Sequence, residues 1–211
     1  MINRRLISFE GPEGSGKSTQ IKYLSERLID MGEQVISVRE PGGTHLGESI
    51  RLKLQAKDSA GLSNTAELLL FMSSRAQLVE EIILPALHEG KWVLCDRFID
   101  SSVAYQGYGR GGDIDLINRL NFYATQGLFP SLTVLLELNI NTCFERLTRR
   151  YSEINSEKDR IESESLDFHQ RVIDGYRILS TTENRFKSID GSQDPDVIAD
   201  KIFQWIMKLE S

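Results

Sequence analysis

The stretch that most constrains the fold of this chain is GPEGSGKS, residues 11–18, which fits the pattern G-x-x-x-x-G-K-[ST]. The apolar residues that end at Phe9 are strand-like, and those from Lys17 onward recur with a helical period, so the motif has the flanks that it requires. Glycines let such a turn aim its backbone N–H groups inward, where they and the start of the helix hold a polyanion. We therefore predict a phosphate-binding loop between a buried strand and a helix.

Two side chains of this loop have predicted tasks. Lys17 can reach the β- and γ-phosphates of a nucleotide, and Ser18 can offer its hydroxyl to Mg²⁺. The loop residues expected at the nucleotide are Gly11, Pro12, Glu13, Gly14, Ser15, Gly16, Lys17, Ser18 and Thr19. The alternative is a chance glycine-rich turn, and the strand before the motif and the helix after it argue against that alternative.

Along the whole chain, short apolar runs alternate with longer segments of helical period. The runs are mostly β-branched or aromatic, as buried parallel strands are. They lie at 6–9, 35–38, 92–95, 132–138 and 186–189. Among the helices between them, we expect one that Gly32 stops, one that begins at Asn64 with Glu67 as its capping-box partner, and one that Asp194-Pro195 opens. This alternation predicts a doubly wound α/β domain that binds ligands at the carboxyl ends of its strands.

Length and charge limit the classes of protein to consider. The 211 residues suit a single domain over 1–211, and the net charge of −6 argues against nonspecific binding to nucleic acid or to a membrane surface. The first ten residues hold only a strand-length apolar run, so we expect no signal peptide, and we expect no bilayer-spanning stretch elsewhere. Cys95 and Cys143 form no disulfide framework and His45, His88 and His169 are scattered, so we expect reduced thiols, no metal cluster and a cytoplasmic location.

A second glycine pattern lies at 107–112, where GYGRGG fits G-x-G-x-x-G. A dinucleotide-binding fingerprint requires a strand directly before it, whereas the residues upstream, SSVAYQ, have a helical pattern. We therefore reject a dinucleotide site here and expect a flexible loop near the nucleotide.

Asp96 and Arg97 stand where the third apolar run stops. An acid at a strand end beside a phosphate loop can hold Mg²⁺, directly or through water, and an adjacent arginine can grip a phosphate with two hydrogen bonds. The alternative is a surface ion pair at a strand end. The neighbouring phosphate loop favours a second anion site on the same edge of the sheet.

Three further segments can border these sites. Phe71 and Arg75 share one helix face, where they can stack on a planar base and bond its edge, unless they are a core phenylalanine and a rim arginine. The turn REPGGT at 39–44 is either a mere connection or a wall of the same pocket. The charged stretch 149–165 is either a solvated loop or frayed helix, or a mobile lid. Two anion sites and a lid would suit the transfer of a phosphoryl group between two nucleotides.

Five segments carry a resemblance that covers essentially the whole chain: FEGPEGSGKST, REPGGT, LLFMSSRAQ, DRFIDSSVAYQGYGRG and DRIESES followed by a helix. Together they resemble the thymidylate kinase family, and REPGGT followed by DR…SSxAYQGxGRG is specific to it, whereas the first segment is generic to phosphate-loop kinases. The resemblance implies a P-loop NTPase-type nucleoside monophosphate kinase, with a five-stranded parallel sheet flanked by helices and a mobile lid. It also implies a homodimer formed by helix packing, and Mg²⁺-dependent transfer of the ATP γ-phosphate to dTMP, giving dTDP on the way to dTTP.

The resemblance also implies an acceptor site, residue by residue. Phe71 is expected to stack on thymine, Arg75 to bond its carbonyl edge, and Tyr105 to crowd the sugar 2′ position and so reject ribonucleotides. Glu13 is expected to face the sugar 3′-hydroxyl or the metal region, and Arg97 to hold the dTMP phosphate. The other residues expected around dTMP are Arg39, Pro41, Ser101, Ser102 and Gln106.

The family divides at the phosphate loop, where some members carry an arginine and this chain has Gly14. Members without that arginine are similar to this chain in placing basic residues in the lid. Arg150 is the preferred lid residue for stabilising the transferring phosphate, with Arg149 and Arg160 as alternatives. The remaining expected positions are Lys17 and Arg97 in the catalytic set, Ser18 and Asp96 at the metal, and Arg146 and Gln193 near adenine.

Two other functions compete with this one. A kinase for UMP, CMP or another small acceptor has the same architecture, and Phe71, Arg75, Tyr105 and Gln106 argue against it only through the family resemblance. A regulatory GTP switch needs a guanine-reading N-K-x-D segment after a strand, and the nearest text, NSEKD, has the wrong order and lies in the charged stretch.

Overall fold

The computed structural model describes residues 2–59, 61–154 and 158–210. Within these residues, five parallel strands form one sheet in the order β2-β3-β1-β4-β5. The strands are β1 (Leu6–Glu10), β2 (Val35–Arg39), β3 (Trp92–Asp96), β4 (Leu132–Glu137) and β5 (Phe186–Asp190). The predicted α/β fold is confirmed, and each predicted apolar run is a strand. Four strands are one residue longer than the predicted run, and the added residue is charged in each: Glu10 in β1, Arg39 in β2, Asp96 in β3 and Asp190 in β5.

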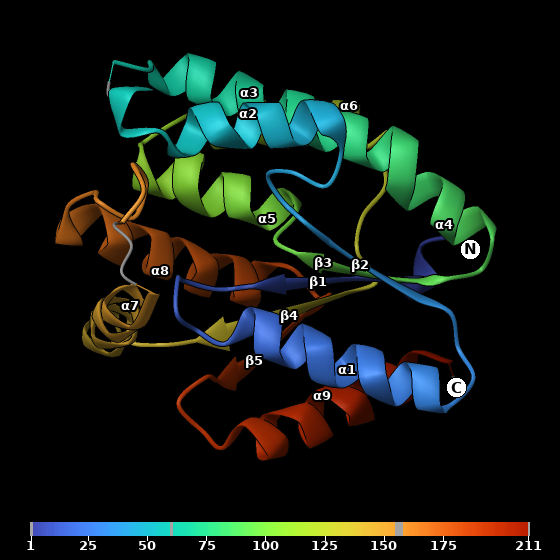
Figure 1. Cartoon of the computed structure of the whole chain (residues 1–211). Coiled ribbons are helices and arrows are strands. Elements are labelled where there is room, and N and C mark those ends of the chain that lie inside the picture. Colours follow the sequence, from blue (N-terminus) through green and yellow to red (C-terminus); the bar gives the residue numbers. More distant parts are fainter. Residues whose placement is uncertain (1, 60, 155–157, 211) are drawn as a thin grey trace.

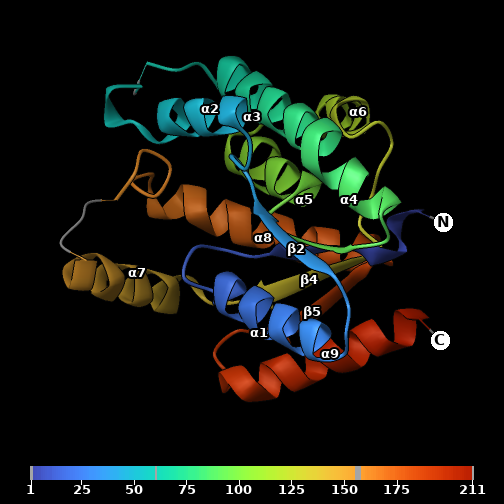
Figure 2. The same ribbon diagram turned by 45° about the vertical axis from the view of Figure 1, so that its right-hand side comes forward.

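Helices cover both faces of the sheet. The α-helices are α1 (Lys17–Asp30), α2 (His45–Gln55), α3 (Asn64–Leu78), α4 (Leu84–His88), α5 (Ile99–Ser102), α6 (Ile114–Ala124), α7 (Ile140–Ile154), α8 (Leu166–Thr182) and α9 (Pro195–Glu210). Short 3₁₀ segments are η1 (Ile2–Arg5) and η2 (Lys57–Ser59), and π-helical segments are η3 (Val79–Ile83) and η4 (Val103–Gly109). In Figures 1 and 2, α1 and α9 lie on one face, and α3, α4, α5, α6 and α8 lie on the other.

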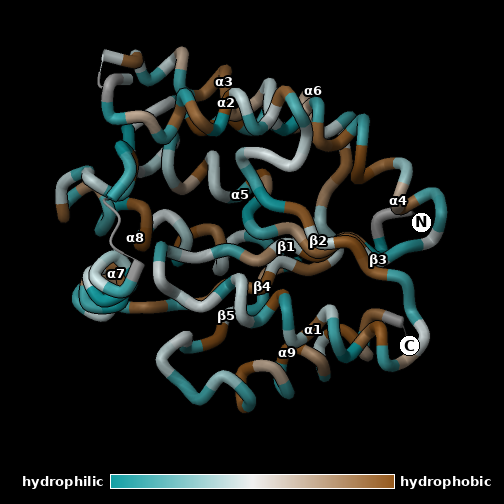
Figure 3. The backbone as a smooth tube through the Cα atoms, in the orientation of Figure 1, coloured by the Kyte–Doolittle hydropathy of each residue, from teal (hydrophilic) through white to brown (hydrophobic). Residues whose placement is uncertain are grey.

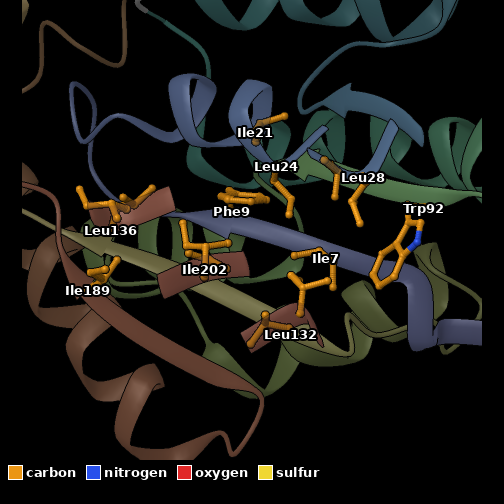
Figure 4. Close-up of a cluster of buried hydrophobic side chains, with 14 residues drawn as sticks. Ile7, Phe9, Ile21, Leu24, Leu28, Trp92, Leu132, Leu136, Ile189 and Ile202 are labelled. Atoms are coloured by element: carbon orange, nitrogen blue, oxygen red, sulfur yellow. The ribbon is translucent and has the colours of Figure 1, made fainter. Parts of the chain in front are cut away.

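The main apolar core lies between the sheet and the pair α1–α9 (Figure 4). Phe9 and Leu136 from the sheet meet Leu24 from α1 and Ile202 from α9 in one cluster of buried side chains. A second cluster fills the opposite face under η3 and α4. Figure 3 accordingly shows hydrophobic residues along the strands and hydrophilic stretches on the outer helices. Because helices cover both faces, the inner strands β1, β3 and β4 are buried along nearly their whole length, which is why they read as continuous apolar runs. The edge strands β2 and β5 are partly exposed.

The helix ends confirm two sequence signals and correct one. Gly32 follows α1 with a φ of 86°, and Asp194 caps α9 by accepting a hydrogen bond from the N–H of Asp196 (2.9 Å). The predicted capping box at Asn64 is wrong, because the cap of α3 is Ser63. Glu67, the expected capping partner, instead points inward, and its side chain is 2% exposed.

The stretch around the second glycine pattern is also different from the prediction. As expected, a helical segment rather than a strand precedes it, so the rejection of a dinucleotide fingerprint is supported. The expected flexible loop is wrong, because Gly107 and Gly109 lie within η4. A Cβ at Gly109 would lie 2.7 Å from the ring of Phe168, so the absence of a side chain lets η4 pack closely against α8.

In the described ranges, no helix has both the length and the apolar character needed to cross a membrane. Cys95 and Cys143 are buried free thiols. Burial raises the pKa of Cys143 to about 11 and that of Cys95 well above its usual value, so both are protonated near neutral pH.

Candidate active site

A cleft of about 770 Å³ lies at the carboxyl ends of the strands and brings most of the predicted residues together. Those that line it are Glu13, Gly14, Gly16, Lys17, Ser18, Thr19, Arg39, Pro41, Phe71, Asp96, Arg97, Ser101, Ser102, Tyr105, Gln106, Arg146, Arg149 and Arg150. The predicted residues outside its lining are Gly11, Pro12, Ser15, Arg75, Arg160 and Gln193. The fold therefore joins the expected donor and acceptor sides in one cavity.

Glycines fix the shape of the phosphate loop. Gly11 has a φ of 137°, and a Cβ there would lie 2.5 Å from the carbonyl oxygen of Leu136 in β4. Gly14 has a φ of 75°, and its Cβ would lie 3.3 Å from the Cβ of Arg146 in α7. A side chain at either position is strained by the backbone conformation. At position 14 an arginine would also crowd α7, and here the basic side chains beside the loop come from α7 itself.

Lys17 lies at the start of α1, directly over the phosphate loop. Its Nζ donates hydrogen bonds to the carbonyl oxygens of Gly11 (3.1 Å) and Pro12 (2.9 Å). Burial, followed by the nearby Arg97, lowers the pKa of Lys17, while neighbouring carboxylates oppose this shift. An ammonium group that holds loop carbonyls in this way can exchange them for the oxygens of a bound phosphate.

Ser18 and Asp96 meet at the rim of the cleft, where the Ser18 hydroxyl donates to Oδ2 of Asp96 at 2.8 Å. A hydroxyl and a carboxylate beside a phosphate loop are the hard oxygen ligands that Mg²⁺ accepts, together with phosphate oxygens and water. The donor set therefore fits Mg²⁺, and metal binding by this pair remains a prediction.

Arg97 follows β3 with a φ of 72°, a left-handed conformation that is uncommon for a residue with a side chain. Its guanidinium donates to Oε1 of Glu13 (2.5 Å) and to the carbonyl oxygen of Gly11 (3.1 Å). Burial alone would raise the pKa of Glu13, but Arg97 and Lys17 outweigh burial and lower that pKa to about 2. Glu13 is therefore ionised, and it holds the Arg97 guanidinium beside the phosphate loop.

Glu10, at the end of β1, supports the same region from behind, and the sequence analysis did not single it out. Its carboxylate accepts hydrogen bonds from the N–H of Phe98 (2.7 Å), the hydroxyl of Ser101 (2.6 Å) and the hydroxyl of Tyr176 (2.8 Å). Burial and then the negative charge of Asp100 raise the pKa of Glu10 to about 7. The hydrogen bond to Phe98 fixes the peptide that follows the left-handed arginine.

Another part of the cleft lining carries two aromatic rings and an amide. Phe71 from α3 is half-buried, and Tyr105 and Gln106 come from η4. The guanidinium of Arg97 lies 5.1 Å from the ring centroid of Tyr105. Gln106 donates through Nε2 to Oε1 of Glu67 (2.9 Å), which fixes its amide. A flat ring and an oriented amide can receive a planar base.

Arg51 in α2 is a second residue of the cleft that the sequence analysis did not name. Its Nη1 donates to the carbonyl oxygen of Pro41 (3.0 Å), as does that of Arg39 at 3.2 Å. Burial, and then the positive charge of Arg39, lowers the pKa of Arg51. Two guanidinium groups beside the Arg39–Thr44 turn form a cationic patch, so the turn is a wall of the pocket rather than a mere connection.

Arg75 lies behind the cleft and is 1% exposed. It forms a buried ion pair with Glu40, and it donates to Ser102 Oγ (2.9 Å), Asn121 Oδ1 (2.5 Å) and the carbonyl oxygen of Phe98 (2.9 Å). Each N–H of the guanidinium thus has a partner. Burial raises the pKa of Glu40, although the ion pair opposes this. Arg75 therefore fixes Glu40 and Ser102, which do line the cleft, and its direct contact with a base remains a prediction.

The predicted lid, 149–165, borders the cleft, and its residues 155–157 lie outside the described part of the chain. Arg150 donates to Glu162 (3.0 Å) and to the hydroxyl of Tyr151 (2.9 Å), and that hydroxyl also binds Glu162. Arg149 is exposed and has a loose pair with Glu153 at 3.9 Å. Both arginines reach the cleft, and the movement of this segment remains a prediction.

Arg160 has different surroundings from the other lid arginines. Its side chain is 10% exposed and pairs with Glu67 at 2.6 Å. It also donates to the carbonyl oxygen of Leu54 (2.9 Å), at the end of α2. Arg160 therefore attaches the charged segment to α2 and α3 and does not face the cleft.

Arg146 links the phosphate loop to the turn after β5. Its Nη1 donates to the carbonyl oxygens of Gly14 and Gly191, both at 3.1 Å. Gln193, two residues further on, is exposed in this turn. Arg146 borders the cleft and Gln193 does not, so contacts of both with adenine remain predictions.

A comparison with known protein families shows to which family the chain belongs. The model of the thymidylate kinase family matches residues 9–202. This chain belongs to the thymidylate kinase family. The matched range contains the phosphate-loop motif, Arg97 and the charged stretch 149–165, and the match confirms the resemblance found in the sequence.

Individual thymidylate kinases are similar to the chain over nearly its whole length. The thymidylate kinase of Desulfovibrio desulfuricans is 49% identical over 193 residues, which are 90% of this chain and 89% of that one. The thymidylate kinase of Solidesulfovibrio magneticus is 46% identical over 206 residues, 96% and 99% of the two chains. That of Thermoanaerobacter pseudethanolicus is 46% identical over 191 residues, 90% and 91% of the two chains.

Proposed function

We propose that this chain is a thymidylate kinase, which transfers the γ-phosphoryl group of ATP to dTMP and releases dTDP and ADP, with Mg²⁺ as cofactor. The observation that carries the proposal is a single cleft that contains the phosphate loop, a cationic second site and an aromatic wall, in a chain of the thymidylate kinase family. The product leads to dTTP by both synthesis and salvage.

On the donor side, the phosphate loop from Gly11 to Thr19 holds the triphosphate of ATP. Lys17 contacts the β- and γ-phosphates, and Arg146 and Gln193 border the adenine. Ser18 and Asp96 would hold Mg²⁺, which would supply positive charge to the phosphate oxygens.

On the acceptor side, Arg97 binds the dTMP phosphate, and Arg39, Arg51 and Pro41 border it. Phe71 stacks on thymine, and Ser102 and Gln106 bond the base edge, with Arg75 behind them. The remaining acceptor contacts are Glu13 at the sugar 3′-hydroxyl, Tyr105 at the 2′ position and Ser101 beside the phosphate. The rigid aromatic wall supports this assignment because it provides a flat, partly apolar surface of the size of a base.

The reaction needs no general base in this chain, because a phosphate monoester is mostly a dianion near neutral pH. An oxygen of the dTMP phosphate forms a bond to the γ-phosphorus. The bond from that phosphorus to the β–γ bridging oxygen breaks, and ADP leaves with its electron pair. The residues contribute by positioning and charge stabilisation: Arg97 aims the acceptor, and Lys17 and Arg150 stabilise charge on the transferring group.

For Arg150 to act, it must leave Glu162, its partner in the structure. Both substrates offer more negative charge than one carboxylate, so their binding favours this exchange. Closure of the lid also excludes water, which would otherwise accept the phosphoryl group.

The family also suggests how the enzyme is assembled and where it works. Helices α3 and α6 expose large apolar side chains, Leu69, Leu116, Phe122 and Tyr123, the last of them 85% exposed. Such a surface supports the homodimer formed by helix packing. The buried free thiols Cys95 and Cys143 fit the reducing cytoplasm.

The test is ADP release from ATP and Mg²⁺ with one acceptor at a time: dTMP, dUMP, UMP, CMP, AMP or GMP. We expect a strong preference for dTMP, with dUMP clearly poorer. Equal or better activity with UMP or CMP would retain a kinase but refute the roles of Phe71, Tyr105 and Gln106. If a folded, ATP-binding sample released no ADP with any acceptor, the transferase itself would be refuted.

A further inference from the structure

Glu67, in the first turn of α3, is a buried carboxylate that the proposed reaction does not use. Its side chain is 2% exposed. Oε1 accepts from Gln106 Nε2 (2.9 Å) and Arg110 Nε (3.3 Å), and Oε2 accepts from Arg110 Nη2 (3.1 Å) and Arg160 Nη2 (2.6 Å). We name Glu67, Gln106, Arg110 and Arg160 the Glu67 cluster. A carboxylate at the cap end of a helix is usually solvated, so its burial among three partners from other segments requires an explanation.

One partner belongs to the segment beyond α7. Arg160 also donates to the carbonyl oxygen of Leu54 (2.9 Å), its backbone N–H donates to the carbonyl oxygen of Gln55 (3.1 Å), and Asp159 accepts from the Gln55 amide (3.0 Å). These contacts fasten the charged segment to the end of α2. Glu67 in α3 provides the other attachment, because its Oε2 accepts the hydrogen bond from the Arg160 guanidinium.

Another partner belongs to the acceptor pocket. Gln106 is 4% exposed and lines the cleft beside Tyr105. The hydrogen bond from Nε2 to Glu67 determines which way the amide is turned, and therefore whether a donor or an acceptor faces the base. A single carboxylate thus touches both the pocket for the base and the segment that carries the lid arginines.

The charges in the cluster make this arrangement sensitive to the loss of one member. Arg110 bridges Glu67 to Glu164, with which it pairs at 2.5 Å. Burial would raise the pKa of Glu67, but its partners, first Arg110 and Gln106, outweigh burial and lower that pKa. Glu67 is therefore ionised, and an ionised buried group holds its remaining partners tightly.

We propose that Glu67 is a positioning residue that couples attachment of the lid, through Arg160, to the orientation of Gln106 in the acceptor pocket. The proposal rests on the proposed function for the identity of the acceptor, dTMP. Because coupling between two sites is reciprocal, dTMP should strengthen the attachment of the lid, and an attached lid should strengthen the binding of dTMP. Arg160 thereby has a positioning role and is not one of the arginines that touch the transferring phosphate.

The test uses the full chain, with the variants Glu67→Gln, Arg160→Gln and the double variant. Hydrogen exchange of a peptide that covers 158–165 reports lid attachment without requiring activity. Steady-state kinetics with dTMP separate KM from kcat. The control is Arg177→Gln, which removes an arginine from an exposed ion pair with Asp174 on α8 (3.1 Å).

We expect dTMP to slow exchange of 158–165 in the original chain and in the control, and to have no such effect in Glu67→Gln or Arg160→Gln. The loss of one charge-assisted hydrogen bond corresponds to about a tenfold increase in KM for dTMP, with a smaller change in kcat. The double variant should be impaired about as much as one single variant, since both remove the same link. If Glu67→Gln fails to fold, Arg160→Gln, on the segment outside the core, decides the question.

If dTMP slowed exchange of 158–165 in both single variants as it does in the original chain, or if the effects on KM multiplied in the double variant, the proposal would be overturned. The outcome for the proposed function is separate. A wild-type chain that does not phosphorylate dTMP refutes that function. Exchange of 158–165 without substrate still tests the attachment, because it should be faster in Glu67→Gln than in the original chain.

Discussion

The buried pair of Arg75 and Glu40 allows a prediction whose magnitude follows from its surroundings. In Arg75→Met, the carboxylate of Glu40 loses its bidentate partner in a site where both side chains are at most 2% exposed. Breaking such a pair from one side costs about 3–5 kcal/mol. For a domain of this size, 1 kcal/mol corresponds to about 2–4 °C in Tm, so we expect Tm to fall by about 6–20 °C.

The loss of stability in Arg75→Met should become larger as the pH rises. Burial already raises the pKa of Glu40, and removal of Arg75 raises it further, so the folded variant takes up a proton more readily than the unfolded chain does. The penalty is therefore small below about pH 3.5, where Glu40 is largely protonated in both states. It grows as the pH rises through the range between the unfolded and the folded pKa.

The assay is urea unfolding of wild type and Arg75→Met at several pH values. Arg177→Met, which breaks an exposed pair, is the matched control and should cost at most about 1 kcal/mol. The double variant Arg75→Met, Glu40→Gln should regain part of the loss, because it removes the unpaired charge. A loss below about 1 kcal/mol for Arg75→Met, or a loss that does not change with pH, would refute the reasoning.

Four shorter predictions test other parts of the molecule. Arg150→Ala should lower kcat by about 10³–10⁵, as removal of an arginine finger does, and raise KM for dTMP much less; a variant that keeps most of its turnover would exclude Arg150 from catalysis. Phe71→Ala should weaken dTMP binding about tenfold in calorimetry, and an unchanged Kd would exclude stacking. Gly11→Ala should abolish ATP binding without unfolding the chain, because its Cβ would lie 2.5 Å from a carbonyl oxygen of β4; normal ATP affinity would contradict this geometry. The raised pKa of Glu10, about 7, implies a stability contribution that is complete below about pH 4.5 and is lost as the pH rises through 7. Relative to Glu10→Gln, the wild type should therefore lose up to about 3 kcal/mol of unfolding free energy between pH 5 and pH 8, and equal pH profiles in urea unfolding would contradict the shift.

The sheet and the phosphate loop could be predicted from sequence because both are local signals. A short apolar run identifies a buried strand wherever it pairs, and the G-x-x-x-x-G-K-[ST] pattern needs only the strand before it and the helix after it. The strand ends were also informative, since Arg39 and Asp96 complete β2 and β3 and both line the cleft. Glu10 completes β1 and carries the same signal, a charged residue at the end of an apolar run.

The parts that could not be predicted depend on contacts between distant segments. The sequence allows Arg75 to lie at the rim of a helix face, but partners from three other segments (the turn after β2, α5 with its cap, and α6) surround it. Arg160 lies in a charged stretch that looks solvated, and its partner Glu67 is 93 residues away. The π-helical turns of η3 and η4 break the 3.6-residue period, so periodicity alone cannot tell which side chains of η4 reach the cleft.

The order of the contacts along the chain has a consequence for the history of such a protein. Apart from Glu13, the acceptor contacts proposed above fall within one continuous block, residues 39–106, whereas the phosphate loop precedes it and the lid and the turn after β5 follow it. A recombination event that replaces this block, with its two ends fixed by β2 and η4, exchanges the specificity for the acceptor in a single step. Apart from Asp96, which lies inside the block, the residues proposed to bind ATP and its metal lie on either side and are inherited unchanged.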